Sequence, residues 1–206
     1  MTEAILHGVI LAFGLIIPLG VQNVFVFNQG ALQPKFSRAL PVVITAGICD
    51  TILIVAAVSG VSLLVLTFAW LENIILSVGI VFLLYMGFVL WRTTVSATEI
   101  EGQTFSMKRQ IIFAASVSLL NPHAILDTIG VIGTNSLSYS GDSRVAFALT
   151  TIIVWWLWFL GLAISGRYFG KLDRSGKLMA LLNKISALVV WAVAIYMATR
   201  LIENIG

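Results

Sequence analysis

Two prolines in the chain are each followed, five residues later, by a polar side chain that could bind a cation or a polar ligand. Pro18 precedes Asn23, and Pro122 precedes Asp127, each inside an otherwise apolar segment. Proline removes one backbone hydrogen bond and clashes with the preceding turn, so a helix is expected to break at each site. In a membrane, broken backbone is tolerated only where protein buries it or where it lines a water-filled cavity. Paired breaks in two halves of a membrane protein therefore predict a transport site.

The polar residues beside the two breaks differ in kind. After the first break, which should include Gly20, the amides of Gln22 and Asn23 could bind a ligand or restore hydrogen bonds lost at the break. At the second break, His123 could relay protons, because an ordinary imidazole titrates at about pH 6.5. It could equally bond a carbonyl group that the break leaves free, and Asn121 lies two residues before it.

Two carboxyl groups lie inside apolar segments. Asp50 is in the second such segment of the chain, and Asp127 is in the fourth. An aspartate at the centre of a membrane helix costs about 2.5–3.5 kcal/mol on insertion scales. We therefore expect both to bind a cation or a proton on a transport path. The alternative is that each caps a broken helix end or bonds a neighbouring hydroxyl group, such as Thr51 or Thr128.

The composition is that of a membrane protein. Only 10% of the residues are charged and 59% are hydrophobic, and the mean hydropathy is +1.03. Soluble domains carry about 25% charged residues, so we expect an all-α polytopic membrane protein with one domain over residues 1–206. A spanning helix needs about 20 mostly apolar residues. Six segments approach this requirement: 4–27, 39–66, 74–91, 111–133, 145–166 and 184–202.

Lysine and arginine gather in three connections between these segments. Ten of the 12 basic residues lie in 28–38, 92–110 and 167–184. Because basic loops stay in the cytoplasm, we expect these connections there and both termini outside. If the first segment re-enters instead of crossing, five crossings remain and the N-terminus is cytoplasmic. The distribution of the basic residues behind the net charge of +3 therefore indicates orientation in a lipid bilayer and not nucleic-acid binding.

Three segments in each half would insert the halves in opposite orientations. We therefore expect about six transmembrane helices arranged as two inverted three-helix repeats, about 1–92 and about 108–206. The first helix of each repeat, helices 1 and 4, would be the broken one.

Two further patterns concern helix packing. Small residues four apart, Gly8 with Ala12 and Gly161 with Ser165, would let helices approach closely. The fifth segment also contains a cluster of tryptophans at Trp155, Trp156 and Trp158. These rings could line a substrate path or pack against helices and lipid.

Together, these motifs resemble those of the LysE/ArgO family of amino-acid exporters, over essentially the whole chain. The motifs are Pro-Leu-Gly-Val-Gln-Asn from Pro18, Asp50, and Leu-Asn-Pro-His from Leu120 with Asp127 and Thr128. Where family members often have Gly-Pro-Gln-Asn, this chain has Val21 in place of the second residue. The resemblance implies export of L-lysine, L-arginine or related amino acids across the bacterial inner membrane, driven by protons or the membrane potential. It also implies a conserved polar core of Gln22, Asn23, Asp50, Asn121, Pro122, His123 and Asp127.

Exporting a cationic amino acid requires an energy source. Moving one positive charge outward against an inside-negative potential costs about 2.3 kcal/mol per 100 mV. Exchange with inward-moving protons removes that obstacle, so we expect a secondary antiporter whose partners are an amino acid, protons and the bilayer. A homo-oligomer is compatible with the sequence, and no cofactor or resident metal is expected.

Two other function classes remain. The carboxylates and His123 could serve an exporter of divalent metal ions, and relatives of the family also suggest a neutral amino acid as cargo. An enzyme is disfavoured because Ser116 and Ser118 carry no nucleophile motif. The single cysteine, Cys49, can form no redox pair within the chain.

Overall fold

The computed structural model describes the whole chain except residues 18–19, 62–68, 93–104, 120–124, 126, 173–176 and 206. Within the described residues every regular element is a helix, as expected. The elements are α1 (Thr2–Ile16), α2 (Val21–Leu32), η1 (Phe36–Arg38), α3 (Leu40–Ala56), η2 (Ala57–Val61), α5 (Ala69–Arg92), α6 (Met107–Leu119), η3 (Asp127–Gly133), α8 (Thr134–Ser136), α9 (Gly141–Leu172) and α10 (Lys177–Ile205).

Two of these helical stretches are long and apolar enough to cross a bilayer. They are Phe36–Gly60 and Gly141–Lys171, among the described residues. The pair α1 and α2 meets the same test only as one bent unit, with an angle of 81° between the two helices. This agrees with a polytopic membrane protein and with a broken first helix. Because a bent pair can be a broken span or a re-entrant loop, the six crossings and the repeat remain predictions.

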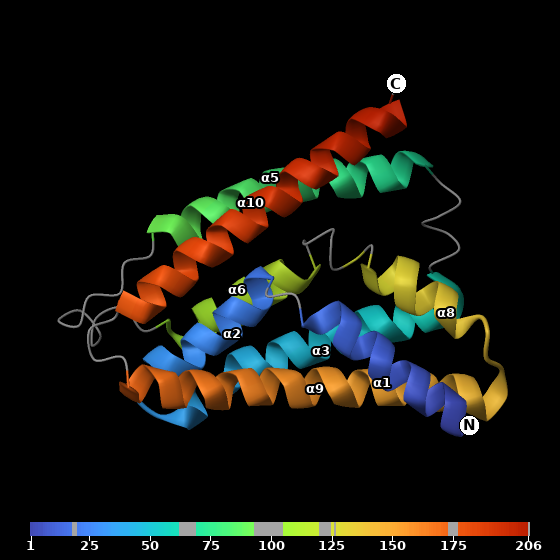
Figure 1. Ribbon diagram of the computed structural model, residues 1–206, viewed down its shortest axis with the longest axis horizontal. Coiled ribbons are helices and arrows are strands. Elements are labelled where there is room, and N and C mark those ends of the chain that lie inside the picture. The colour runs from blue at the N-terminus through green and yellow to red at the C-terminus, as the bar shows by residue number, and fades with distance from the viewer. Residues whose placement is uncertain are drawn as a thin grey trace.

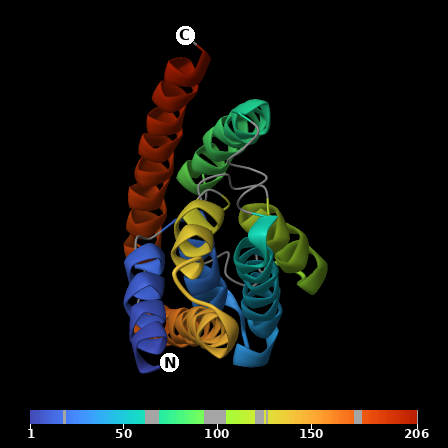
Figure 2. The same cartoon turned by 90° about the vertical axis from the view of Figure 1, so that its right-hand side faces the viewer.

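The helices form two groups. Figure 1 shows α5 and α10 side by side, above a layer that contains α1, α2, α3, α6 and α9. The long α9 contacts α1, α2 and α3 along its length, and Figure 2 looks down it with α1 and α3 on either side.

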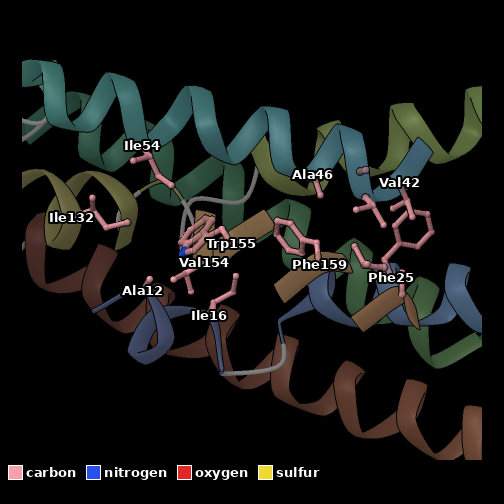
Figure 3. Packing of buried hydrophobic residues seen from close by; sticks show 14 of the residues in the cluster. Ala12, Ile16, Phe25, Val42, Ala46, Ile54, Ile132, Val154, Trp155 and Phe159 are labelled. Atoms are coloured by element: carbon pink, nitrogen blue, oxygen red, sulfur yellow. The ribbon is translucent and has the colours of Figure 1, made fainter. Parts of the chain in front are cut away.

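The main core surrounds the middle of α9. Figure 3 shows Trp155 between Ile54 of α3, Ile132 of η3 and Ile16 of α1, so this ring joins the two broken segments. A second cluster joins the α5–α10 pair to the layer below. It comprises Val21, Val24, Leu76, Leu83, Val117, Ala187, Val190, Ala194 and Met197.

Glycines set the distance between α2 and α9. A Cβ atom added to Gly30 would lie 2.1 Å from the carbonyl oxygen of Ala163, and one added to Gly166 would lie 2.0 Å from that of Phe27. Such separations are shorter than any real contact, so the two backbones touch because both residues lack a side chain. Small residues let membrane helices approach in this way.

The small-residue pairs expected from sequence have different outcomes. Gly8 and Ala12 are buried, and a Cβ at Gly8 would lie 3.0 Å from the carbonyl oxygen of Phe147 on α9. The pair Gly161 and Ser165 was a wrong prediction, because both residues are exposed and a Cβ at Gly161 would meet no atom within 4 Å.

Two arginines near the ends of α9 bond carbonyl groups of other elements. Arg167 donates to the carbonyl oxygens of Gln33, at 2.5 Å, and Pro34, at 2.8 Å, directly after α2. Arg144 donates to the carbonyl oxygen of Val58 in η2, where Gly60 interrupts the helix with φ of 99°. Carbonyl groups at helix ends lack partners within their own helix, so α9 supplies donors for both.

Candidate functional site

Asp50 lies at the centre of the candidate site. It projects from the middle of α3 and is only 2% exposed. The side-chain amide of Gln22 donates a hydrogen bond to its Oδ2 atom over 2.8 Å. Because the first break makes Gln22 the second residue of α2, the interruption itself brings this amide to the carboxyl group.

The start of α2 adds a group of backbone donors beside Gln22. Gly20 is the N-cap residue of α2, and no described side chain caps this end of the helix. The first N–H groups of a helix have no partner within it, and the helix dipole gives this end a partial positive charge. The α2 terminus is therefore suited to hold a carboxylate group.

Asn23 has a different role from its neighbour Gln22. Its side-chain amide donates to the carbonyl oxygen of Ile16 over 2.8 Å, across the break between α1 and α2. Ile16 is the last residue of α1, where carbonyl groups lack helical partners. Of the two roles open to this amide, the structure shows the one that restores a backbone hydrogen bond.

We expect Asn23→Leu to lower the stability of the protein more than its transport. A lost hydrogen bond that leaves a buried partner unsatisfied costs about 1–3 kcal/mol, which should appear as a lower melting temperature in detergent. Initial transport rates per folded molecule should stay within about threefold of wild type. A large rise in the substrate KM at unchanged melting temperature would instead assign Asn23 to ligand binding.

Ser118 completes the described part of the site from α6. It is fully buried and faces the Asp50 carboxyl group. Among the described residues, Asp50 Oδ1 and Ser118 Oγ have no hydrogen-bond partner at bonding geometry. Unpaired buried polar atoms are costly; these two atoms lie near enough to interact with each other, and both could also bond a ligand. The sequence motifs of the site do not include Ser118, although its position four residues before Pro122 is a signal for it.

Thr51 is not the partner of Asp50. Its hydroxyl group donates to the carbonyl oxygen of Gly47 over 2.6 Å and accepts from the indole of Trp156 over 3.0 Å. Trp156 also covers Gly47, where an added Cβ would lie 2.6 Å from the ring. This tryptophan therefore packs α9 against α3.

The other two tryptophans of the cluster also point into the protein. Trp155 is 8% exposed, and Trp158 stacks edge-on with Phe13 of α1 at 6.3 Å between ring centroids. Among the described side chains, both indole N–H groups lack a partner. Of the roles predicted for these rings, the structure shows helix packing.

Much of the second break lies outside the described residues. This applies to Asn121, Pro122 and His123, and to Pro18 of the first break. Asp127 begins the π-helix η3, which packs against η2 and α3. Its neighbour Thr128 is buried, and its hydroxyl group has no partner in the described structure.

Acidic, histidine and cysteine side chains do not gather elsewhere in the described residues. No group of three or more that could hold a metal ion occurs among them. Asp50 and Gln22 are thus the predicted site residues that the structure brings together, and the first break positions them.

Comparison with known proteins identifies similar chains. The sequence model described as LysE type translocator matches residues 13–201. A putative amino-acid transporter of Bacillus subtilis, YisU, is 56% identical over 202 residues, which cover 98% of this chain and 92% of the relative. The arginine exporter proteins ArgO of an Enterobacter strain and of Escherichia coli K12 are each 32% identical, over 204 and 197 residues. These alignments cover 97% and 93% of this chain, and 95% and 92% of the relatives. No solved structure matches.

Proposed function

Because the chain belongs to the LysE type translocator family, a family of amino-acid transporters, we propose that it exports basic amino acids in exchange for protons. Arginine is the first candidate for the substrate, and lysine is the second. The observation that carries the proposal is the buried carboxyl group of Asp50, which has one unpaired oxygen and lies beside the uncapped start of α2.

The two parts of this site match the two ends of a basic amino acid. The N–H groups at the start of α2 suit the α-carboxylate, as helix N-termini suit anions in general. The unpaired Oδ1 of Asp50 suits a cationic group, with Gln22 holding the carboxyl group in place through Oδ2. Ser118 would bond the same ligand from α6. Charge-assisted hydrogen bonds of this kind are roughly twice as strong as neutral ones.

The second break would provide the coupling to protons. In this proposal Asp127 and His123 take up and release the proton, and Asn121 and Pro122 shape the broken segment. The contact between η2 and η3 supports communication between the two halves, because η3 begins at Asp127. Gln22 and the start of α2, at the first break, would by contrast hold the substrate.

Helix contacts support an inverted repeat. The broken segment of the first half, α1 with α2, packs on α9, and the broken segment of the second half, α6 with η3, packs on α3. The last helices of the halves, α5 and α10, pack on each other. Two halves related by a pseudo-twofold axis would produce such a reciprocal pattern, and rocking of these halves would expose the site alternately to each side.

The proposed location is a bacterial inner membrane, with residues 28–38, 92–110 and 167–184 in the cytoplasm. Arg167 bonds the carbonyl oxygens of Gln33 and Pro34, so two of these connections meet at one end of the molecule. This contact supports their location on the same side of the membrane.

We expect net arginine transport in proteoliposomes to be driven by a pH gradient. Liposomes loaded with unlabelled arginine should accumulate labelled arginine. In a separate assay, an imposed proton gradient should drive net arginine movement in the direction opposite to proton flow. Net arginine movement that responds to neither the pH gradient nor the membrane potential would contradict proton exchange.

Competition identifies the substrate class in the same assay. Lysine should inhibit labelled arginine uptake strongly, and alanine and leucine weakly. Inhibition by divalent metal ions alone would show that the cargo is a metal ion. Equal inhibition by neutral amino acids would show that the substrate class is not restricted to basic amino acids.

A further inference from the structure

A second pair of buried polar side chains joins α2 to α10. The side-chain amide of Asn28 donates to Oδ1 of Asn183 over 2.5 Å. Asn28 is 7% exposed and Asn183 is 1% exposed. These residues are 155 positions apart in the chain, and neither belongs to the motifs by which the sequence resembles its family.

Each amide of this pair keeps one unpaired polar atom. Oδ1 of Asn28 and Nδ2 of Asn183 have no hydrogen-bond partner among the described residues. The bonded pair therefore carries one free acceptor and one free donor. Exchanging the oxygen and nitrogen of both amides would keep one free acceptor and one free donor but would swap the residues that carry them. Buried polar groups are nearly always paired, so these two atoms could each bond a ligand that reaches the pair.

The pair lies between Asp50 and the end of the molecule where two basic connections meet. Asn28 precedes Leu32, the last residue of α2, by four residues, or about 6 Å along the helix. Arg167 binds the carbonyl groups just beyond that end. Gln22, which bonds Asp50, is six residues away in the other direction, about 9 Å along the same helix. A substrate that enters from this end would reach the amide pair first.

We propose that Asn28 and Asn183 form a second, cytoplasmic-side binding site for the α-ammonium and α-carboxylate groups that all amino acids share. This inference rests on the proposed function and its membrane orientation. The free oxygen of Asn28 accepts from the ammonium group, and the free N–H of Asn183 donates to the carboxylate group. Neither residue is charged, so the site recognises the common part of the substrate and leaves selection of the side chain to Asp50.

Analogues of arginine that lack one of the two groups test this site. Agmatine lacks the α-carboxylate, and 5-guanidinovaleric acid lacks the α-ammonium. Their inhibition constants against labelled arginine uptake are measured in inside-out membrane vesicles, where the cytoplasmic face is exposed. In wild type, arginine should inhibit at least about tenfold better than either analogue, because a hydrogen bond to a charged group is lost in each case.

The two variants should change these preferences separately. Asn183→Leu should reduce the ratio of the inhibition constants of agmatine and arginine about tenfold. Asn28→Leu should reduce the ratio of the inhibition constants of 5-guanidinovaleric acid and arginine by a similar factor. The isosteric Asn183→Asp replaces the donor by a negative charge that repels the α-carboxylate. It should therefore lower the preference for arginine over agmatine further. This variant provides the test if the leucine variants do not fold. A purely structural amide pair would lower the rate and leave both ratios unchanged.

A matched control is Gln110→Leu. Gln110 of α6 is as buried as Asn183 and also keeps one unpaired atom, its Oε1, but its N–H groups are bonded to the backbone carbonyls of Arg38 and Phe105 at 3.0 Å and it belongs to neither helix of the pair. This variant should keep wild-type ratios. Unchanged ratios in the folded Asn28 and Asn183 variants, with normal arginine export by wild type, would overturn the second site alone. Failure of the wild type to transport arginine would instead overturn the proposed function.

Discussion

Asp50→Asn is expected to reduce arginine export at least about 100-fold while the protein still inserts into the membrane. The substitution keeps the size of the side chain and one acceptor oxygen but removes the negative charge. Breaking a buried charge pair costs about 3–5 kcal/mol, which corresponds to a loss of roughly 100-fold or more. The measurement is labelled arginine counterflow in proteoliposomes, normalised to the amount of protein in the membrane.

The matched control for this charge is Glu3→Gln. Glu3 is exposed in the first turn of α1, so its variant should export at the wild-type rate. Asp127→Asn should behave like Asp50→Asn if both carboxyl groups lie on the transport path. Wild-type flux in both aspartate variants would refute the assignment of the site.

Gly166→Leu is expected to prevent normal packing of α2 against α9. An added Cβ would lie 2.0 Å from the carbonyl oxygen of Phe27 and 3.2 Å from the backbone nitrogen of Ala31. Backbone atoms cannot rotate away as a flexible side chain can, so the helices must separate. Overpacking a core costs about 1–3 kcal/mol, and more where the neighbours are fixed. We expect most of the folded protein to be lost, as measured by monodisperse yield and melting temperature in detergent.

Gly161→Leu provides the control on the same helix. It adds the same side chain only five residues away, where a Cβ meets nothing within 4 Å. Its melting temperature should match that of wild type. An equal loss of stability in both variants would show that the leucine acts through something other than the contact between α2 and α9.

These two glycines also show what the sequence could predict about helix packing. The pattern of small residues four apart selected Gly161 with Ser165, whereas the contact uses Gly166 with Gly30. In a soluble protein, polar residues mark the outward face of a helix. In lipid the outward face is apolar as well. Leu157 and Ile164 are exposed on α9, and their residue types do not distinguish this face from the buried one.

The candidate site was predictable in its parts but not in its pairing. Proline and glycine chemistry predicted the first break, and the bend of 81° between α1 and α2 agrees with it. The cost of a carboxyl group in lipid singled out Asp50. That Gln22, 28 positions away, bonds Asp50 while Asn23 bonds the backbone depends on the rotation of α2 about its axis. That rotation is set by packing against α9, which local sequence does not encode.

The hydrogen bonds of Arg144 and Arg167 have a consequence for how the chain is made. Both arginines belong to the second half, and the carbonyl groups that they bond, of Val58 and of Gln33 with Pro34, belong to the first. A ribosome releases the first half before α9 exists, and domains generally form in that order. The carbonyl groups of these earlier segments therefore gain their arginine donors only after α9 has been made.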